Sequence, residues 1–475
     1  MSYTQIPQVV LTDSAVQKAF NAAVKNLMEI NTIACDFAVY NATGLLNPEV
    51  PFMMRAGGSY QTPWTRDAAI NTWCAGRLLE PKVAKNTLYA VCVKDADGNP
   101  IIQPDDQRWD RVVWCVGAWQ YYLATGDLEF LAVARGIVER ALKRLDEEWF
   151  CEETGLYRGG SFFNDGISGY PRDIYMPGKD HSFMGEHPAT ETIHSFSTNC
   201  IYCEAWRILD RMNAILGVSD GEPAKRHAAL KAAILRTFWN EEEGKCNYLR
   251  YPDGRIDPSQ ELAGISFGVL FGILPEKALE NLMQEAYGIP SIMPPFPGLF
   301  SKERPGRHNN LVWPFLNGFF IQAAAGAGKV NLAGEELKKM AALYNSNEGI
   351  FEIYNPYDGS VDGGWQIGGD DLQGHLWDSC PDQTWSATSY IGAVLQGIFG
   401  VRMEEEGIAF APCVPECLKN SSVRDLVIRG KKFHVTLCGF GTEVAEMTVN
   451  GKTVDTARLN YADAEENNEI VLTLK

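Results

Sequence analysis

The chain has 475 residues, which is too long for one ordinary hydrophobic core and predicts two or three domains, or one large toroidal domain with a small appendage. Hydrophobic residues make up 45% and charged residues 21%, a composition that argues against disorder. With 42 Lys and Arg against 60 Asp and Glu, the net charge is −18, and an acidic chain without a basic stripe repels phosphate backbones, which excludes nucleic acid as a partner.

Amphipathic periodicity predicts about twelve helices along the first 400 residues. Asp13 and Ser14 open the first of them, and Gly residues such as Gly126 and Gly326 close others. The predicted ranges are 14–30, 66–80, 82–95, 108–126, 128–148, 195–215, 223–240, 259–272, 276–287, 308–326, 331–345 and 383–400.

The connections between these helices alternate between short and long. Long loops in a compact domain are usually functional, and in a ring of helical hairpins every second connection reaches the same rim. The sequence therefore predicts a mainly α fold, an (α/α)6 toroid of six helical hairpins whose long loops crowd one mouth. The predicted long loops are 31–65, 96–107, 149–194, 241–258, 288–307 and 346–382.

From Glu404 onward the pattern changes to strands. Apolar and polar residues alternate in 407–411, 423–429, 432–438, 443–449 and 468–474, with turn signals at Gly430-Lys431 and Asn450-Gly451. We therefore expect a catalytic barrel over 1–404 and a small β-sandwich or sheet domain over 405–475.

The 12 cysteines are scattered and do not suggest a disulfide framework. The sequence begins MSYTQIPQVV and lacks both a signal-peptide pattern and a run of about 18 apolar residues, so we expect a cytoplasmic protein with no membrane partner. No metal-binding spacing occurs among the seven histidines, and no cofactor is implied. A structural calcium stays open, because such sites leave no reliable sequence trace.

Polar and aromatic residues gather where the long loops lead into helices. Arg66 and Asp67 follow Trp64 at the start of a predicted helix, and this combination of a donor fork, an acceptor and an apolar plate suits sugars. An ion-pair cap on the helix explains the same residues equally well. Half of the 12 Trp lie in or beside these loops, at positions 64, 109, 313, 365, 377 and 385, and this favours a carbohydrate-binding cleft.

Glycoside cleavage needs two carboxyl groups, one to protonate the leaving oxygen and one to activate water or to attack carbon. Asp165 in the third long loop and Glu352 in the sixth would face each other across the mouth of the ring. Spacing alone does not select them from sixty acidic residues.

Several segments resemble the six-hairpin glycosidases. Tyr60 with WTRD at 64–67 is similar to the glucoamylase segment whose Arg and Asp hold hydroxyls of the terminal sugar. The segment EIYNPYDG at 352–359, followed by WSA at 385–387, resembles the block of processing α-glucosidase and mannosylglycerate-hydrolase-like enzymes in which the Glu is the general base. That resemblance implies the same role for Glu352. The stretch from His308 to Pro314 is similar to a debranching-type motif, with Asn310 in place of Gly.

The resemblance leaves two candidates for the general acid. In the α-glucosidase-like and trehalase families an S-G-x-D loop carries the acid, which selects Asp165 here, although Phe replaces the Gly. In the maltose-phosphorylase-like branch the acid is a Glu, which would select Glu191. We prefer Asp165, because burial near Phe162 and Phe163 could raise its pKa.

The resulting hypothesis is an exo-acting, inverting glycoside hydrolase on short α-linked oligosaccharides or glycosides, of unknown oligomeric state. A phosphorylase of the same fold is the first rival, with Lys302, Arg304 and Arg307 as phosphate ligands. A sugar epimerase or lyase that uses His308 or His375 and a non-catalytic carbohydrate-binding protein are the others. The expected substrate-binding residues are Trp64, Arg66, Asp67, Trp109, His308, Trp313, Tyr354, Gln383 and Trp385.

Overall fold

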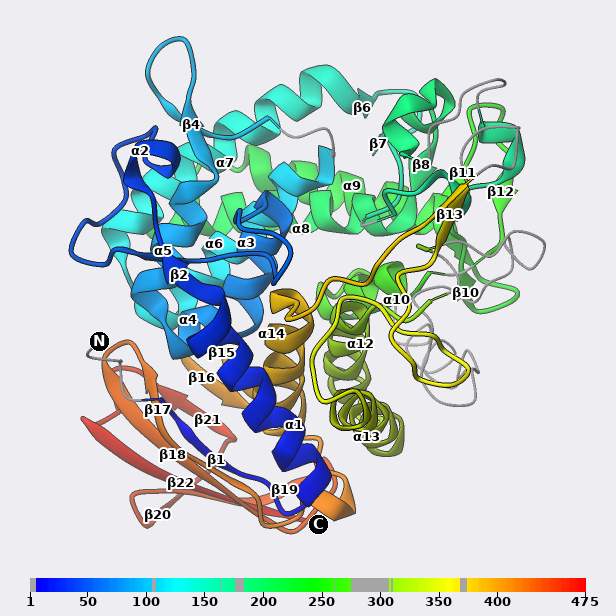
Figure 1. Cartoon of the computed structure of the whole chain (residues 1–475). Coiled ribbons are helices and arrows are strands. Elements are labelled where there is room, and N and C mark those ends of the chain that lie inside the picture. Colours follow the sequence, from blue (N-terminus) through cyan, green and yellow to red (C-terminus); the bar gives the residue numbers. More distant parts are fainter. Residues whose placement is uncertain are drawn as a thin grey trace.

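The computed structural model describes residues 6–104, 108–162, 164–175, 183–259, 261–274, 307–308, 311–367 and 374–475. Helices are its main secondary structure, and a sheet that contains the C-terminal strands lies along one side (Figure 1).

The inner helices form a closed ring. Each packs on the next, and the last returns to the first. They are buried on nearly all faces, since every residue of Pro314–Ala325 is buried, as expected for helices surrounded by other helices. In ring order they are α3 (Thr65–Asn71), α6 (Arg108–Thr125), α8 (Phe196–Ile215), α10 (Leu262–Leu270), α12 (Pro314–Gly326) and α14 (Thr384–Gly392).

The outer helices are amphipathic and bury one stripe each against this ring. In α7 the buried residues Phe130, Ala134, Ile137 and Ala141 recur at helical spacing. The outer helices are α1 (Ser14–Lys25), α5 (Pro81–Ala90), α7 (Leu128–Trp149), α9 (Glu222–Phe238) and α13 (Val330–Ser346). The predicted helix 276–287 lies outside the described residues. Inner and outer helices alternate along the chain, and the predicted (α/α)6 toroid is confirmed.

Two boundary predictions are wrong for local reasons. The helix predicted from residue 308 begins at Pro314, because proline favours the first turn of a helix and Val312 pairs instead with Tyr354. The helix predicted over 82–95 ends at Ala90, where a hairpin of β4 (Cys92–Lys94) and β5 (Pro100–Ile102) follows. The helix predicted over 66–80 agrees with the structure, in which α3 continues through a π-turn at Thr72–Gly76 into the short α4 (Arg77–Leu79). Further π-turns lie at Asn26–Asn31 and Ala393–Ile398, and a four-residue helix, α2, at Phe37–Tyr40.

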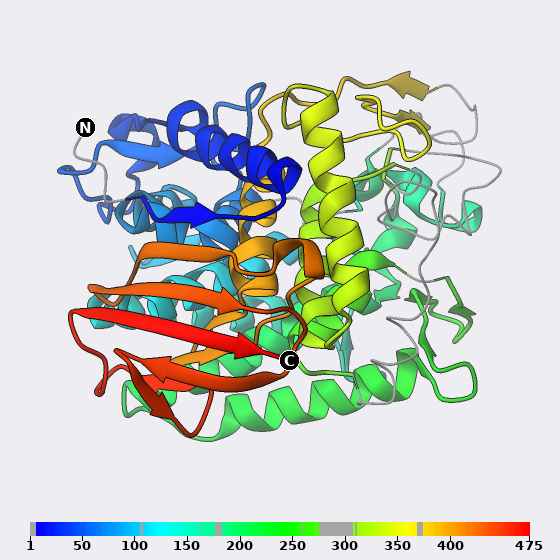
Figure 2. The ribbon, with the colours of Figure 1, turned by 90° about the horizontal axis from the view of Figure 1, so that it is seen from below.

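The C-terminal strands build a six-stranded sheet in the order β1-β17-β18-β22-β19-β20, seen as one layer in Figure 2. Its strands are β1 (Gln8–Val10), β17 (Ser422–Ile428), β18 (Lys431–Cys438), β19 (Val444–Val449), β20 (Lys452–Val454) and β22 (Asn467–Leu474). Strands β18 and β22 are parallel, and the other pairs are antiparallel. Positive φ angles at Asn450 (51°) and Gly451 (76°) mark a tight hairpin turn.

A smaller sheet joins β15 (Val401–Met403), β16 (Gly407–Phe410) and β21 (Arg458–Asn460). Strand β15 precedes the expected domain boundary at residue 405, and β1 comes from the start of the chain. Arg429 lies between β17 and β18 of the six-stranded sheet. Its backbone N–H donates to the carbonyl oxygen of Ala124 at 2.8 Å, which joins that sheet to the end of α6.

Short strand pairs occupy the connections of the ring. They are β2 (Thr32–Ala34) with β3 (Phe52–Met54), β6 (Phe150–Cys151) with β7 (Leu156–Tyr157), β8 (His194–Ser195) with β11 (Leu249–Arg250) and β12 (Ile256–Asp257), β9 (Trp239–Asn240) with β10 (Lys245–Cys246), and β13 (Trp365–Ile367) with β14 (Gly374–Leu376). None of the helices described has the length and the apolar run that a membrane span needs.

Candidate active site

The starts of the inner helices carry most of the predicted site residues. Arg66 and Asp67 lie in the first turn of α3, and Trp109 in the first turn of α6. Trp313 directly precedes α12, and Gln383 directly precedes α14. Because successive inner helices of a hairpin ring run in the same direction, these residues share one rim.

Arg66 holds Asp165 with a fork of two hydrogen bonds. Its Nη1 donates to Oδ1 at 3.1 Å, and its Nη2 donates to Oδ2 at 2.9 Å. Nε of Arg66 lies 3.6 Å from Asp110, and the guanidinium sits 5.5 Å from the Trp385 ring centroid. Burial alone would lower the pKa of Arg66, but Asp165 and Asp110 raise it above its ordinary value. The third long loop is thereby fixed to the start of α3.

Arg307 holds Glu352 in the same way. Its Nη2 donates to Oε2 of Glu352 at 2.7 Å, and its Nη1 donates to the carbonyl oxygen of Gly363 at 2.8 Å. The guanidinium also lies 5.3 Å from the Trp313 ring and 5.7 Å from the Trp377 ring. Burial raises the pKa of Glu352, although the Arg307 cation lowers it. Glu352 is therefore a buried carboxylate with one arginine partner.

Asp67 lies close enough to both ion pairs to feel their charges, and it has no arginine fork of its own. It is 4% exposed, and its Oδ1 has no hydrogen-bond partner among the described residues. Burial raises the pKa of Asp67 to about 8, against the effect of Arg66, and the charges of Glu352 and Asp165 raise it further. At neutral pH the folded protein therefore keeps Asp67 mainly protonated, as a hydrogen-bond donor.

This raised pKa predicts a pH-dependent stability for Asp67→Asn. A carboxyl whose pKa is about 8 when folded and near 4 when unfolded contributes stability at low pH that is lost as the pH rises through that window. Asparagine cannot ionise, so the variant should melt several degrees above the parent at pH 9 and close to it at pH 5. Melting curves across pH 5–9 measure this. An unchanged difference across the range would contradict it, and Asp97→Asn, at an exposed position, is the control.

The aromatic residues of the rim fall into two groups. Trp64, Trp365 and Trp377 are 49%, 42% and 44% exposed, whereas Trp109, Trp313 and Trp385 are buried. Trp385 stacks on Phe315 at 4.3 Å, and Trp313 on His308 at 5.0 Å. Burial and the nearby Arg307 and Arg66 lower the pKa of His308 far below 6.5, so this imidazole is neutral and a weak base.

Several buried polar atoms at this rim lack a hydrogen-bond partner within the described part of the chain. Buried polar groups are normally satisfied, and exceptions mark functional sites or bound groups. They include acceptors and indole donors, which match what sugar hydroxyls need. These atoms are Oδ1 of Asp67, Oε1 of Gln383, and Nε1 of Trp109 and Trp385.

The loop that carries Asp165 is anchored by Glu261, which precedes α10. The Ser161 hydroxyl donates to Oε2 of Glu261 at 2.5 Å, and the backbone N–H of Ser197 donates to Oε1 at 2.7 Å. The Ser197 hydroxyl in turn accepts from the N–H of Phe162 at 3.1 Å. Glu261 is 1% exposed, and burial raises its pKa to about 7. Sequence reasoning missed this residue, because nothing local links it to a loop 100 residues away.

Removal of this anchor should disturb catalysis through Asp165. We expect Glu261→Ala to lower kcat about tenfold, because the buried Ser161 and Ser197 groups lose a charged partner worth about 1.5–3 kcal/mol each, with a smaller change in KM. Glu261→Gln, which keeps an acceptor for Ser197, should recover most of the rate. Steady-state kinetics with a melting curve for each variant measure this. Equal losses in the two folded variants would contradict the anchoring role.

The remaining predicted residues do not lie in the first turn of an inner helix. Glu191 is half-buried at the end of a short 3-10 helix, Pro188–Glu191. Tyr354 lies in the core, where its hydroxyl accepts from the N–H of Phe351 at 2.8 Å. Phe163, expected beside the acid, lies outside the described residues. In the described part of the chain, no group of three or more His, Cys, Asp or Glu is placed to hold a metal.

This toroid of helical hairpins is the fold of the six-hairpin glycosidases, and a match to a family model makes the protein a glycoside hydrolase of this class. Residues 112–386 match the mannosylglycerate hydrolase MGH1-like glycoside hydrolase domain, and the chain belongs to this family.

Solved structures share the fold at low sequence identity. A mannosylglycerate hydrolase of family GH63 from Thermus thermophilus, solved in complex with glucose, is 13% identical with a TM-score of 0.58, over 79% of this chain and 99% of that one. A structure described as a sialidase is 14% identical with a TM-score of 0.69, over 97% of this chain. A GH78 family rhamnosidase of Bacillus sp. GL1 is 14% identical with a TM-score of 0.54, over 91%. The chain spans 42% of the length of each of these last two proteins. No curated protein sequence matches it.

Proposed function

We propose that the protein is an exo-acting, inverting glycoside hydrolase that cleaves short α-linked oligosaccharides or glycosides. Asp165 is the general acid and Glu352 the general base. The observation that carries this proposal is the pair of ion pairs at the rim, Arg66 with Asp165 and Arg307 with Glu352, since both carboxylates act electrostatically on the buried Asp67. Two carboxyl groups close to one buried polar residue supply the pair that glycosidic cleavage requires.

Arg66 and Asp67 bind the terminal sugar in this proposal. The protonated Asp67 donates to one hydroxyl, and the Arg66 fork moves from Asp165 to neighbouring hydroxyls when the sugar binds. Glu352 stays paired with the Arg307 cation, which favours its ionised form, and takes a proton from water.

A phosphorylase is less well supported. Arg307, one of the three cations that could form a phosphate pocket, is buried and committed to Glu352. Lys302 and Arg304 lie outside the described residues. The substrate is therefore proposed to react with water, and a mannosylglycerate hydrolase of the same fold was solved in complex with glucose.

A panel of chromogenic α- and β-glycosides, assayed with and without inorganic phosphate, tests this function. We expect turnover of at least one α-glycoside at a rate that phosphate does not change, with release of the free sugar. Turnover only with phosphate, yielding a sugar phosphate, would make the protein a phosphorylase. Binding of sugars without turnover of any of these glycosides would contradict the proposed hydrolysis.

A further inference from the structure

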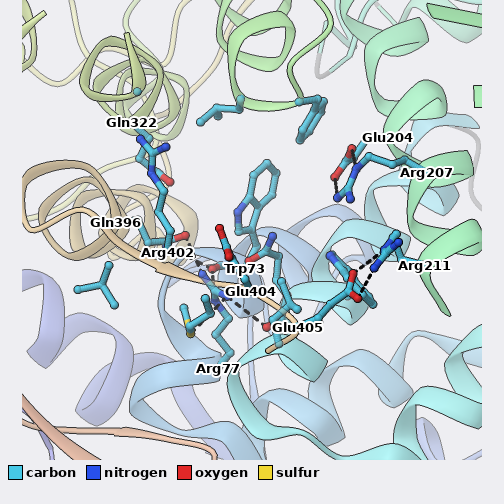
Figure 3. Close-up of a pocket in the computed structure, with 18 of the residues that line it drawn as sticks. Trp73, Arg77, Glu204, Arg207, Arg211, Gln322, Gln396, Arg402, Glu404 and Glu405 are labelled. Atoms are coloured by element: carbon cyan, nitrogen blue, oxygen red, sulfur yellow. Dashed lines mark hydrogen bonds and ion pairs between the residues drawn. The ribbon is translucent and has the colours of Figure 1, made fainter. Parts of the chain in front are cut away.

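A cavity of about 750 Å³ opens at the end of the toroid opposite the candidate active site. Figure 3 shows the residues that line it. Its walls come from the C-terminal halves of the inner helices, including Gln120 of α6, Arg207 of α8 and Gln322 of α12, and from the segment 401–406 with Arg458. The candidate active site occupies the opposite ends of the same helices. We call this cavity the basal well. Its volume falls within the range of about 300–1,000 Å³ that is typical of small-molecule sites.

Most charges on the wall of the basal well are already paired. Arg207 binds Glu204 with two hydrogen bonds of 2.7 and 2.6 Å, and Arg211 binds Glu405 with two of 2.6 and 2.5 Å, as Figure 3 shows. Arg458 binds Glu404. These pairs neutralise three of the carboxylates that would otherwise repel an anion.

Two further guanidinium groups have no carboxylate within hydrogen-bond distance among the described residues. The side chain of Arg402 makes neither a hydrogen bond nor an ion pair with the described residues. It is accessible to water, and the surrounding protein lowers its pKa. Both observations fit a side chain on a concave wall. Arg77 is 2% exposed and donates only to neutral acceptors, among them oxygens of Trp73, Gln120 and Gln396. Arg77 is thus a charge taken out of water without a counter-ion, which is costly, so the well favours an anion.

The same wall offers what a sugar ring needs. Phe271 lines it as a partly exposed apolar ring, backed by the buried Trp73, whose ring stacks on it at 5.9 Å. The side-chain amides of Gln322 and Gln396 lie on the wall beside the two guanidinium groups. Aromatic faces pack against the C–H face of a sugar, and amides exchange hydrogen bonds with its hydroxyls.

We propose that the basal well binds a sugar that carries an oxyanion, either a phosphate or a carboxylate, with the oxyanion on Arg402 and the ring against Phe271. The site is separate from the catalytic rim and does not depend on the proposed hydrolysis. Its occupant touches both the ring of helices and the segment 401–406, which leads into the C-terminal strands.

Isothermal titration of the full chain tests this site, with glucose 6-phosphate, gluconate, glucose and inorganic phosphate as probes. The Glu352→Gln variant serves as the parent, so that turnover does not interfere. We expect glucose 6-phosphate or gluconate to bind and Arg402→Gln to weaken that binding about tenfold or more, the effect of losing a charge-assisted contact. Whichever of the two binds more tightly identifies the oxyanion.

The matched control is Arg424→Gln, which changes the net charge equally at an exposed position of β17. It should leave binding unchanged, and melting curves should show that both variants fold. Equal affinity in the Arg402→Gln variant, or no binding of either anionic sugar at millimolar concentration, would overturn the proposal. If glucose binds as tightly as the charged sugars, the oxyanion plays no role in binding. If inorganic phosphate binds as tightly as the charged sugars, the sugar ring plays none.

Discussion

Glu352→Gln is expected to lower kcat by about 10²–10⁴-fold, the usual contribution of a general base, while binding of a monosaccharide survives. Glutamine has the size of glutamate and can still accept the hydrogen bond from Arg307, so the local structure should persist. It cannot accept a proton from water at neutral pH. Single-turnover rates together with calorimetric binding of the product sugar separate the two effects.

The matched control for this change is Glu336→Gln on the outer helix α13. Glu336 is also buried, at 1% exposed, and it accepts from Nδ2 of Asn317 at 2.7 Å. Its loss should lower the melting temperature and leave kcat nearly unchanged. Retention of near-parental activity by the Glu352→Gln variant would show that another group activates the nucleophile.

Asp165→Asn should produce a defect that depends on the leaving group. Without a proton donor, glycosides with a poorly acidic aglycone should lose about 10²–10⁴-fold in rate, whereas a dinitrophenyl glycoside, which leaves without protonation, should lose far less. The substitution also removes one anionic partner of Arg66, so we expect KM to change as well. A series of aryl glycosides of graded acidity measures the dependence.

Glu191→Gln tests the alternative acid directly. It should behave like the parent across the same series, because in our proposal the half-buried Glu191 takes no part in proton transfer. If Glu191→Gln instead shows the steep dependence on the leaving group, and Asp165→Asn does not, the assignment of the acid is wrong.

Much of the ring was predictable because its helices follow from patterns within short stretches of sequence. Alternating loop lengths and buried or amphipathic faces mark α12 and α7 in the sequence itself. Two of the elements that were missed depend on distant partners. Strand β1 has only three residues and forms because Ser422–Ile428, more than 400 residues later, offers it an edge. The stretch 308–313 has helical periodicity, but Val312 gains a strand partner in Tyr354 instead.

The candidate site shows the same division. Arg66, Asp67 and Glu352 were visible because each lies in a recognisable motif. Arg307 appeared only as one of several loop cations, and its pairing with Glu352 brings together residues 45 positions apart. Glu261 carried no motif at all. Tyr354 was predicted to bind substrate, and the structure adds that its hydroxyl accepts from the N–H of Phe351 in its own loop, a contact that a motif cannot reveal.

Proton NMR of the sugar released during the first turnovers tests the central proposal most directly. An inverting enzyme with Asp165 as acid and Glu352 as base should release the β-anomer from an α-glycoside, and the α-anomer should appear later, at the rate of spontaneous mutarotation. The α-anomer as the first product would mean retention through a covalent intermediate and would contradict the proposed roles of the two carboxylates.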